Sequence, residues 1–129
     1  MFIASLVMFA LAQADAGGPE RQVYDVVFAP LERQERRYAD LGPVGPYYPE
    51  RASRAHQSGE AILQCQAEAS GRLQHCAPVA ETRGGWGFAI AARIMADRKR
   101  IMAAGSPTAG ETILVRVPFS LGAPVTTKP

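Results

Sequence analysis

Residues 59–81 read GEAILQCQAEASGRLQHCAPVAE, and this stretch decides the fold. Over residues 61–67 apolar and polar side chains alternate, a period of two that is typical of a strand with one buried face. Residues 68–71 (EASG) predict a turn in which Gly takes a left-handed conformation. A second strand follows over residues 72–81. We therefore predict a β-hairpin.

The hairpin carries both cysteines of the chain, Cys65 and Cys76. We expect them to form a disulfide, which requires an oxidising compartment; two buried free thiols are the alternative. A two-residue turn places the two cysteines directly opposite each other. A bulged turn shifts the register by one, so that a second irregularity is needed, and the interval of three between Leu73 and Cys76 hints at one.

Other cysteine chemistry fits less well. A zinc site needs three or four ligands, and only His75 and the more distant His56 could join the cysteines. His75 and Cys76 are neighbours on a strand, so their side chains point to opposite faces and cannot share a metal. A redox pair is more typically C-x-x-C. We expect no metal site.

The flanking segments complete an α+β unit. Residues 49–57 begin with Pro-Glu, which favours a helix start. Residues 88–103 predict an amphipathic helix, and residues 112–121 alternate as a third strand. Pro118 lacks a backbone donor, so this strand should lie at a sheet edge or bulge there. The expected fold is a two-layer α-β-β-α-β domain over residues 47–122, with a three-stranded antiparallel sheet and a tail at 123–129.

The N-terminal part predicts export. Residues 2–12 are an apolar run of signal-peptide length, and small residues follow it, so residues 1–16 are expected to be a signal peptide. No Lys or Arg precedes the run; with a longer native N-terminus it would be the end of an inner-membrane anchor. Residues 17–46 are expected to be poorly structured or weakly helical. Within them, residues 22–28 (QVYDVVF) form either a short strand or an extended segment.

Composition and motifs exclude several function classes. A net charge of +2 does not indicate nucleic-acid binding. The basic cluster at residues 98–100 follows the predicted helix, where cations complement the helix dipole. The glycine-rich residues 84–87 precede the same helix and could hold an anion, but they lack the dinucleotide fingerprint, so we expect a plain loop. No nucleophile–base or P-loop motif occurs. We expect neither an enzyme nor a cofactor.

Residues 48–121 resemble the C-terminal domain of TonB, the periplasmic end of the energy transducer that acts on outer-membrane receptors. Four pieces carry the resemblance. Residues 48–52 (YPERA) are similar to the Y-P-x-x-A helix start of the family, and residues 59–63 (GEAIL) to its strand opening. Residues 69–73 (ASGRL) match its hairpin, and residues 115–119 (VRVPF) its closing strand. In having one cysteine on each hairpin strand, the chain is similar to a TonB-like subgroup common in alphaproteobacteria.

The resemblance implies binding rather than catalysis. In the family, a receptor segment called the TonB box adds as an extra strand to the exposed last strand of the sheet. The expected partner is therefore a TonB-dependent outer-membrane receptor or a similar periplasmic protein, and Pro at Val115 should abolish its capture. Arg116 should flank the added strand. The expected contact residues are Tyr47, Tyr48, Thr112, Ile113, Leu114, Val115, Arg116 and Val117.

The chain also departs from a full transducer. The apolar run at residues 2–12 is shorter than the membrane helix that couples a transducer to the ExbB–ExbD motor, and no long Pro-rich spacer lies between this run and residue 47. The sequence therefore predicts a periplasmic TonB-like binding module in TonB-dependent transport. The alternative is a small secreted structural domain, stapled by its disulfide, whose edge strand forms a homodimer.

Overall fold

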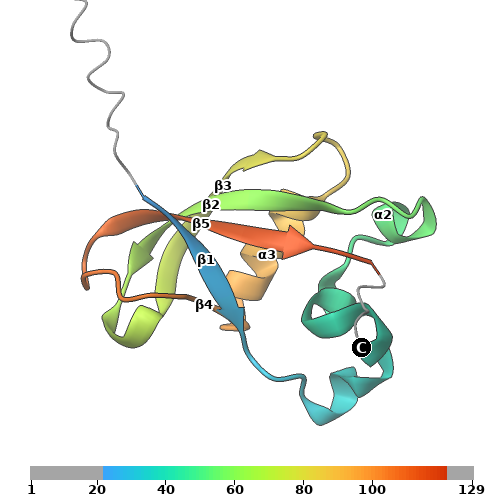
Figure 1. The fold of residues 1–129 in the computed structure, drawn as a ribbon, viewed down its shortest axis with the longest axis horizontal. Helices are drawn as coiled ribbons and strands as arrows, with labels where there is room; N and C mark the ends of the chain where they lie inside the picture. Colours follow the sequence, from blue (N-terminus) through green and yellow to red (C-terminus); the bar gives the residue numbers. More distant parts are fainter. Residues whose placement is uncertain (1–21, 122–129) are drawn as a thin grey trace, which may run out of the picture.

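The computed structural model describes residues 22–121, without the side chains of residues 37–41. The fold is α+β, with the helix at residues 88–97 packed against a curled β-sheet (Figure 1). No helix in the described part of the chain is long and apolar enough to cross a membrane. The expected signal peptide at 1–16 and tail at 123–129 lie outside the described residues. The elements in chain order are β1 (Val23–Phe28), the 3-10 segment η1 (Arg33–Tyr47), α2 (Glu50–Arg54), β2 (Gly59–Ala67), the turn η2 (Ala69–Gly71), β3 (Leu73–Glu81), α3 (Phe88–Asp97), β4 (Ile101–Ala103) and β5 (Thr112–Phe119).

The sheet has five strands in the order β3-β2-β5-β1-β4, so the expected three-stranded sheet is wrong. Neighbouring strands are antiparallel except β1 and β5, which run parallel. The α3 helix packs on β2 and β3, and every second residue of the central strands is buried, as the period of two predicts. The buried residues are Ala61, Leu63, Cys65 and Ala67 of β2 and Ile113, Val115, Val117 and Phe119 of β5.

The hairpin of β2 and β3 is confirmed. Its loop is the three-residue turn η2, in which Ser70 and Gly71 both take left-handed conformations, with φ of 66° and 80°. Gly71 is required on steric grounds as well, because a Cβ atom there would lie 2.7 Å from the carbonyl oxygen of Ala103 in β4. The hairpin turn therefore rests against the backbone of the strand at the far end of the sheet.

The disulfide between Cys65 and Cys76 is present, and a bulge makes it possible. The three-residue turn pairs Ala67 with Leu73, a register that leaves Cys65 one residue short of Cys76. His75 supplies the correction: its φ is 55°, and the register shifts by one at this point. The Cα atoms of the two cysteines are 4.1 Å apart. Of the two registers that the sequence left open, the bulged one is observed.

The helix predicted for residues 88–103 ends at Asp97, which corrects the prediction. Lys99 takes a left-handed conformation with φ of 59°. Its N–H and that of Arg100 fold back onto carbonyl groups of the last helical turn, the pattern of a Schellman motif. The chain reverses there, and the next three residues form β4 instead of a further helical turn.

The N-terminal segment is also more ordered than expected. From Val23 onward it forms β1, and Tyr24, Val26 and Phe28 pack against the core. Of the two forms predicted for residues 22–28, a short strand or an extended segment, the strand is observed rather than the poorly structured segment expected over 17–46, because alternate apolar side chains find a buried face. The η1 segment that follows is a run of 3-10 turns, interrupted at Gly42 with φ of 78°.

We predict that Gly71→Ala lowers the free energy of unfolding by about 2 kcal/mol, because the substitution adds left-handed strain to a clash with the Ala103 carbonyl group. The matched control is Gly110→Ala. Gly110 has φ of 91°, but a Cβ atom there would meet no described atom within 4 Å. Urea denaturation of both variants measures the difference, and equal losses would show that the turn does not rest tightly on β4.

Candidate strand-binding site

The predicted contact residues of the last strand lie in β5, but β5 is not at a sheet edge. It lies between β2 and β1, and β1 pairs with Leu114, Val115 and Arg116. The expectation of a free edge is therefore wrong, because the chain's own N-terminal segment covers it. Ile113, Val115 and Val117 face the core, Leu114 and Arg116 are partly exposed, and Thr112 is exposed.

The pairing between β1 and β5 is short. The N–H of Leu114 donates to the carbonyl oxygen of Gln22 at 3.3 Å, so the N–H groups of every second residue of β5 face β1. Pro118 is in this series and has no N–H to donate. The register between the two strands ends at Asp25 and Arg116, after which β1 pairs with β4. Pro118 therefore lies beyond the part of β5 that pairs with β1. Because its missing N–H would point to the β1 side, the pairing of β5 with β2 loses no hydrogen-bond donor.

Arg116 bridges three strands on the outer face of the sheet. Its guanidinium group lies 3.1 Å from Asp25 Oδ1 in β1 and 3.6 Å from Glu60 Oε2 in β2. All three side chains are more than a third exposed, so these ion pairs stabilise the fold little. The residue expected to flank an added strand already contacts the strand that occupies that position.

The two predicted tyrosines have different positions. Tyr48 is buried, and its ring packs edge-on against Phe88 and Phe119, with ring centroids 6.0 and 5.7 Å apart. Its hydroxyl donates to the carbonyl oxygen of Gln57. Tyr48 is therefore a core residue and does not present its ring to a partner. Since Phe119 ends β5, Tyr48 lies beyond the stretch of β5 that pairs with β1.

Tyr47 is partly exposed and lines an open groove of about 420 Å³. The groove is largely apolar, and it includes Ile90 and Ile94 on the outer side of α3, which are 66% and 40% exposed. Arg98 lies over the Tyr47 ring, 6.0 Å from its centroid. The structure therefore brings Tyr47 to α3 rather than to the paired part of β5.

A buried ion pair fastens the N-terminal segment to this region. The carboxylate of Glu35 is 2.9 Å from the guanidinium of Arg100 and accepts a hydrogen bond of 2.9 Å from Tyr47. The N–H of Glu32 donates to the same carboxylate and is the strongest influence that lowers the pKa of Glu35. Burial raises this pKa, and Tyr47 and Arg100 lower it again. The net pKa lies below its ordinary value.

The glycine-rich loop before α3 already holds an anion from the chain itself. The carboxylate of Glu81 accepts hydrogen bonds from the N–H groups of Gly85 at 2.8 Å and Ala89 at 2.7 Å. Burial raises the pKa of Glu81, but these donors and the N–H groups of Gly87 and Trp86 outweigh it, so the pKa is lowered. The N–H groups that could have bound an external anion are therefore used to hold the side chain of Glu81.

The described residues contain no cluster of side chains that could hold a metal ion. Cys65 and Cys76 are bonded to each other, and in residues 22–121 no three side chains of His, Cys, Asp or Glu gather as a metal site would need. The site residues that sequence reasoning missed are those of β1 that cover β5, namely Val23, Tyr24 and Asp25. The apolar alternation of residues 24, 26 and 28 was the available signal.

The chain matches no model of a known protein family, and a search of curated proteins finds no significant relative.

Proposed function

We propose that this protein is an exported, TonB-like protein-binding module. It receives an extended segment of a partner, such as the TonB box of an outer-membrane receptor, on the β1-facing edge of β5. Because β1 covers this edge, the partner segment replaces the N-terminal half of β1, residues 23–25. The C-terminal half stays paired with β4, so the exchange does not require the whole N-terminal segment to leave.

One observation carries the proposal: the edge of β5 already pairs with a short parallel strand, β1, which comes from the segment before the α-β-β-α-β unit. Only three residue pairs join β1 to β5, and Val23 in this stretch is 42% exposed. The ion pair between Asp25 and Arg116 is exposed and contributes little. An edge that is covered by so short a strand is suited to strand exchange, in which backbone pairing supplies affinity.

Two further observations support parts of the proposal. The disulfide of Cys65 and Cys76 is typical of proteins from an oxidising compartment, which favours export. The order of α2, β2, β3, α3 and β5 agrees with the α-β-β-α-β order implied by the TonB resemblance. The proposed role in TonB-dependent transport rests on that resemblance.

The test is a titration of the full chain with a labelled TonB-box peptide, comparing the wild type with Tyr24→Pro. The N–H of Tyr24 faces β5, because Leu114 donates to Gln22 and the ladder alternates. Removing this donor weakens the hold of β1 and should raise the affinity of the peptide about fivefold, the equivalent of one backbone hydrogen bond. Fluorescence anisotropy measures the change.

The matched control is Val23→Pro, since the N–H of Val23 faces away from β5. It should leave the affinity nearly unchanged. Pro at Val115 is unsuitable as a test, because that N–H faces β2 and its loss would damage the sheet. Absence of peptide binding to both the wild type and Tyr24→Pro, with both proteins folded by circular dichroism, would sink the proposal.

A homodimer formed through edge strands is the second candidate. It is favoured by the outer edges of β3 and β4, with which no described strand pairs. Sedimentation of the full chain distinguishes the two candidates. A stable dimer that the TonB-box peptide neither binds nor dissociates would favour self-association.

A further inference from the structure

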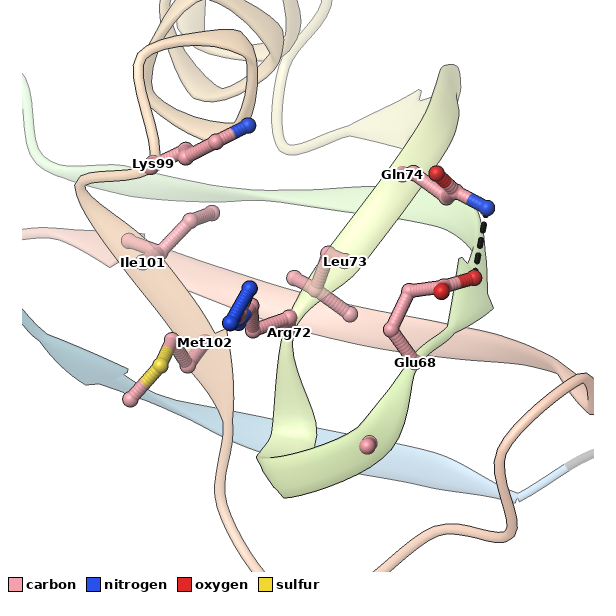
Figure 2. A pocket seen from close by; sticks show the side chains of 8 residues that line it. Glu68, Arg72, Leu73, Gln74, Lys99, Ile101 and Met102 are labelled. Carbon is pink, nitrogen blue, oxygen red and sulfur yellow. Dashed lines mark hydrogen bonds between the residues drawn. The ribbon is translucent and has the colours of Figure 1, made fainter.

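The two ends of the sheet approach each other and leave a pocket between them. At the closest point, the Gly71 turn rests on the Ala103 carbonyl group. Beside this contact opens a pocket of about 440 Å³, with the hairpin on one side and β4 on the other (Figure 2). This pocket is separate from the edge of β5 that the proposed function uses. Its lining residues are Glu68, Ala69, Arg72, Leu73, Gln74, Lys99, Ile101 and Met102.

Both walls of the pocket are outer strand edges, and the Gly71 turn covers the edge of β4 at Ala103 but not at Ile101. The carbonyl group of Arg100 accepts from Ala29, and the N–H of Ala104 donates to Asp25, so these residues turn their backbone groups toward β1. By alternation, the backbone groups of Ile101, which lies between them, face away from β1. The outer edges of β3 and β4 pair with no other described strand. An extended peptide could therefore pair with the edge of β4.

The outer edge of β3 has the same property at the pocket. The carbonyl group of Arg72 accepts from the N–H of Glu68 and so faces β2. The next residue, Leu73, therefore turns its N–H and carbonyl groups away from β2. Backbone donors and acceptors are thus available on both walls.

The side chains of the pocket combine an apolar floor with positive charge. Leu73 and Ile101 form the floor and are 8% and 2% exposed. Arg72 lies between the two walls, and Lys99 extends over the pocket from the end of α3 (Figure 2). The carboxylate of Glu68 is held by the side-chain amide of Gln74. In residues 22–121 neither Arg72 nor Lys99 forms a salt bridge, so both cations are available to an anionic group.

Lys99 holds this position at a conformational cost. It is the left-handed residue of the Schellman motif that ends α3, a position that strongly favours Gly. A residue with a side chain in this conformation costs about 1 kcal/mol relative to Gly. The cation complements the dipole at the end of α3, and the same charge is placed to bind an anion in the pocket.

The geometry points to a second peptide-binding site in this pocket, for an extended segment of a partner protein that carries a carboxylate. In this arrangement the segment pairs with the outward backbone groups of Ile101 in β4, an apolar side chain covers Leu73 and Ile101, and the carboxylate binds Arg72 and Lys99. The pairing gives affinity, and the two cations select an acidic segment over a neutral one.

The test uses the full chain and a labelled seven-residue peptide of alternating valine and glutamate. A peptide with glutamine in place of glutamate is the neutral comparison. Lys99→Gly removes the cation and relieves the left-handed strain, so it should keep or raise the melting temperature. We expect it to weaken binding of the acidic peptide at least fivefold, with binding located by amide chemical shifts of Leu73, Ile101 and Ala103.

The matched control is Arg83→Gly. Arg83 is also a cation with a left-handed backbone, with φ of 48°, but it does not line the pocket. It should leave peptide affinity unchanged. The inference is overturned if the wild type does not bind the acidic peptide, if the glutamine peptide binds equally well, if Lys99→Gly binds as the wild type does, or if the shift changes map to β5. Tyr24→Pro should not change binding of the acidic peptide to this pocket. The two peptides and their variants therefore test the pocket and the proposed function separately.

Discussion

Replacing Arg100 with Met is expected to lower the free energy of unfolding by about 3 kcal/mol at neutral pH. Arg100 and Glu35 are 12% and 10% exposed at their side chains, and their charged groups are 2.9 Å apart. Removing the cation leaves the carboxylate of Glu35 buried without its charge partner, which is strongly destabilising. The carbonyl group of Pro30 also loses its donor, since Arg100 binds it at 2.6 Å. Urea denaturation measures the loss.

The loss should depend on pH in a definite direction. In the wild type the pKa of Glu35 is lowered, so its contribution to stability is present above the unfolded-state pKa and is lost as pH falls through the folded-state pKa. A protonated Glu35 carries no charge, so its burial does not require the guanidinium of Arg100 as a counter-charge. The difference between the wild type and Arg100→Met should therefore shrink below about pH 4.

Arg98→Met is the matched control for this prediction. Arg98 is exposed and lies over the Tyr47 ring without an ion pair to Glu35. Its loss should cost little in comparison. Equal losses for the two variants, or a difference that does not shrink as the pH is lowered from 7 to about 3, would contradict the role assigned to Glu35 and Arg100.

This anchor bears on the proposed strand exchange. Arg100 holds the segment that follows β1, and β4 holds residues 26–28. Residues 23–25 pair with β5, and the carbonyl group of Asp25 also accepts a hydrogen bond from the N–H of Ala104, just after β4. The two halves of β1 are therefore held by different contacts, and the first half can leave β5 while the second half stays fixed.

The hairpin and its disulfide could be predicted from sequence because their information is local. The alternation over residues 61–67 defines the buried face, and the turn and the cysteines lie within a dozen residues of one another. Even the bulge left a trace, the interval of three between Leu73 and Cys76. No signal identified His75 as the residue that forms the bulge, because His75 takes a left-handed conformation that Gly more commonly adopts.

The end of α3 could not be predicted for a related reason. Residues 97–100 (DRKR) contain good helix formers and no Gly, the usual signal for a left-handed helix end. The observed stop at Lys99 depends on β4 pairing with β1 and on Arg100 reaching Glu35, contacts that span about 70 residues. Tertiary contacts therefore outweigh local helix propensity here.

The candidate site, too, could be predicted only in part from the sequence. The strand at residues 112–119 and its buried face follow from alternation, and Pro118 indicated a place where pairing stops. Whether the edge was free depended on a partner strand 91 residues away, as the contact between Asp25 and Arg116 shows. Residues 22–28 are compatible with either a short strand or an extended segment, and nothing in their sequence indicates beside which strand they lie.

Reduction of the disulfide between Cys65 and Cys76 is expected to lower the free energy of unfolding by about 2–3 kcal/mol. The bond closes a loop with a sequence separation of 11 residues and so restricts the unfolded chain. The hairpin should keep its register after reduction, because the register is set by the turn at Gly71 and by the buried face of β2 as well as by the bond. Urea denaturation with and without reductant measures the loss.

A chain with both cysteines replaced by alanine controls for effects of the reductant on the rest of the protein. Cys65 is 1% exposed, so this variant also loses buried volume and should be less stable than the reduced wild type. Hydrogen exchange of the β3 amides should rise in both, since β3 is an outer strand that the bond ties to β2. Equal stability of the oxidised and reduced wild type, or two titratable thiols in the protein as purified, would contradict the bond's role as a staple.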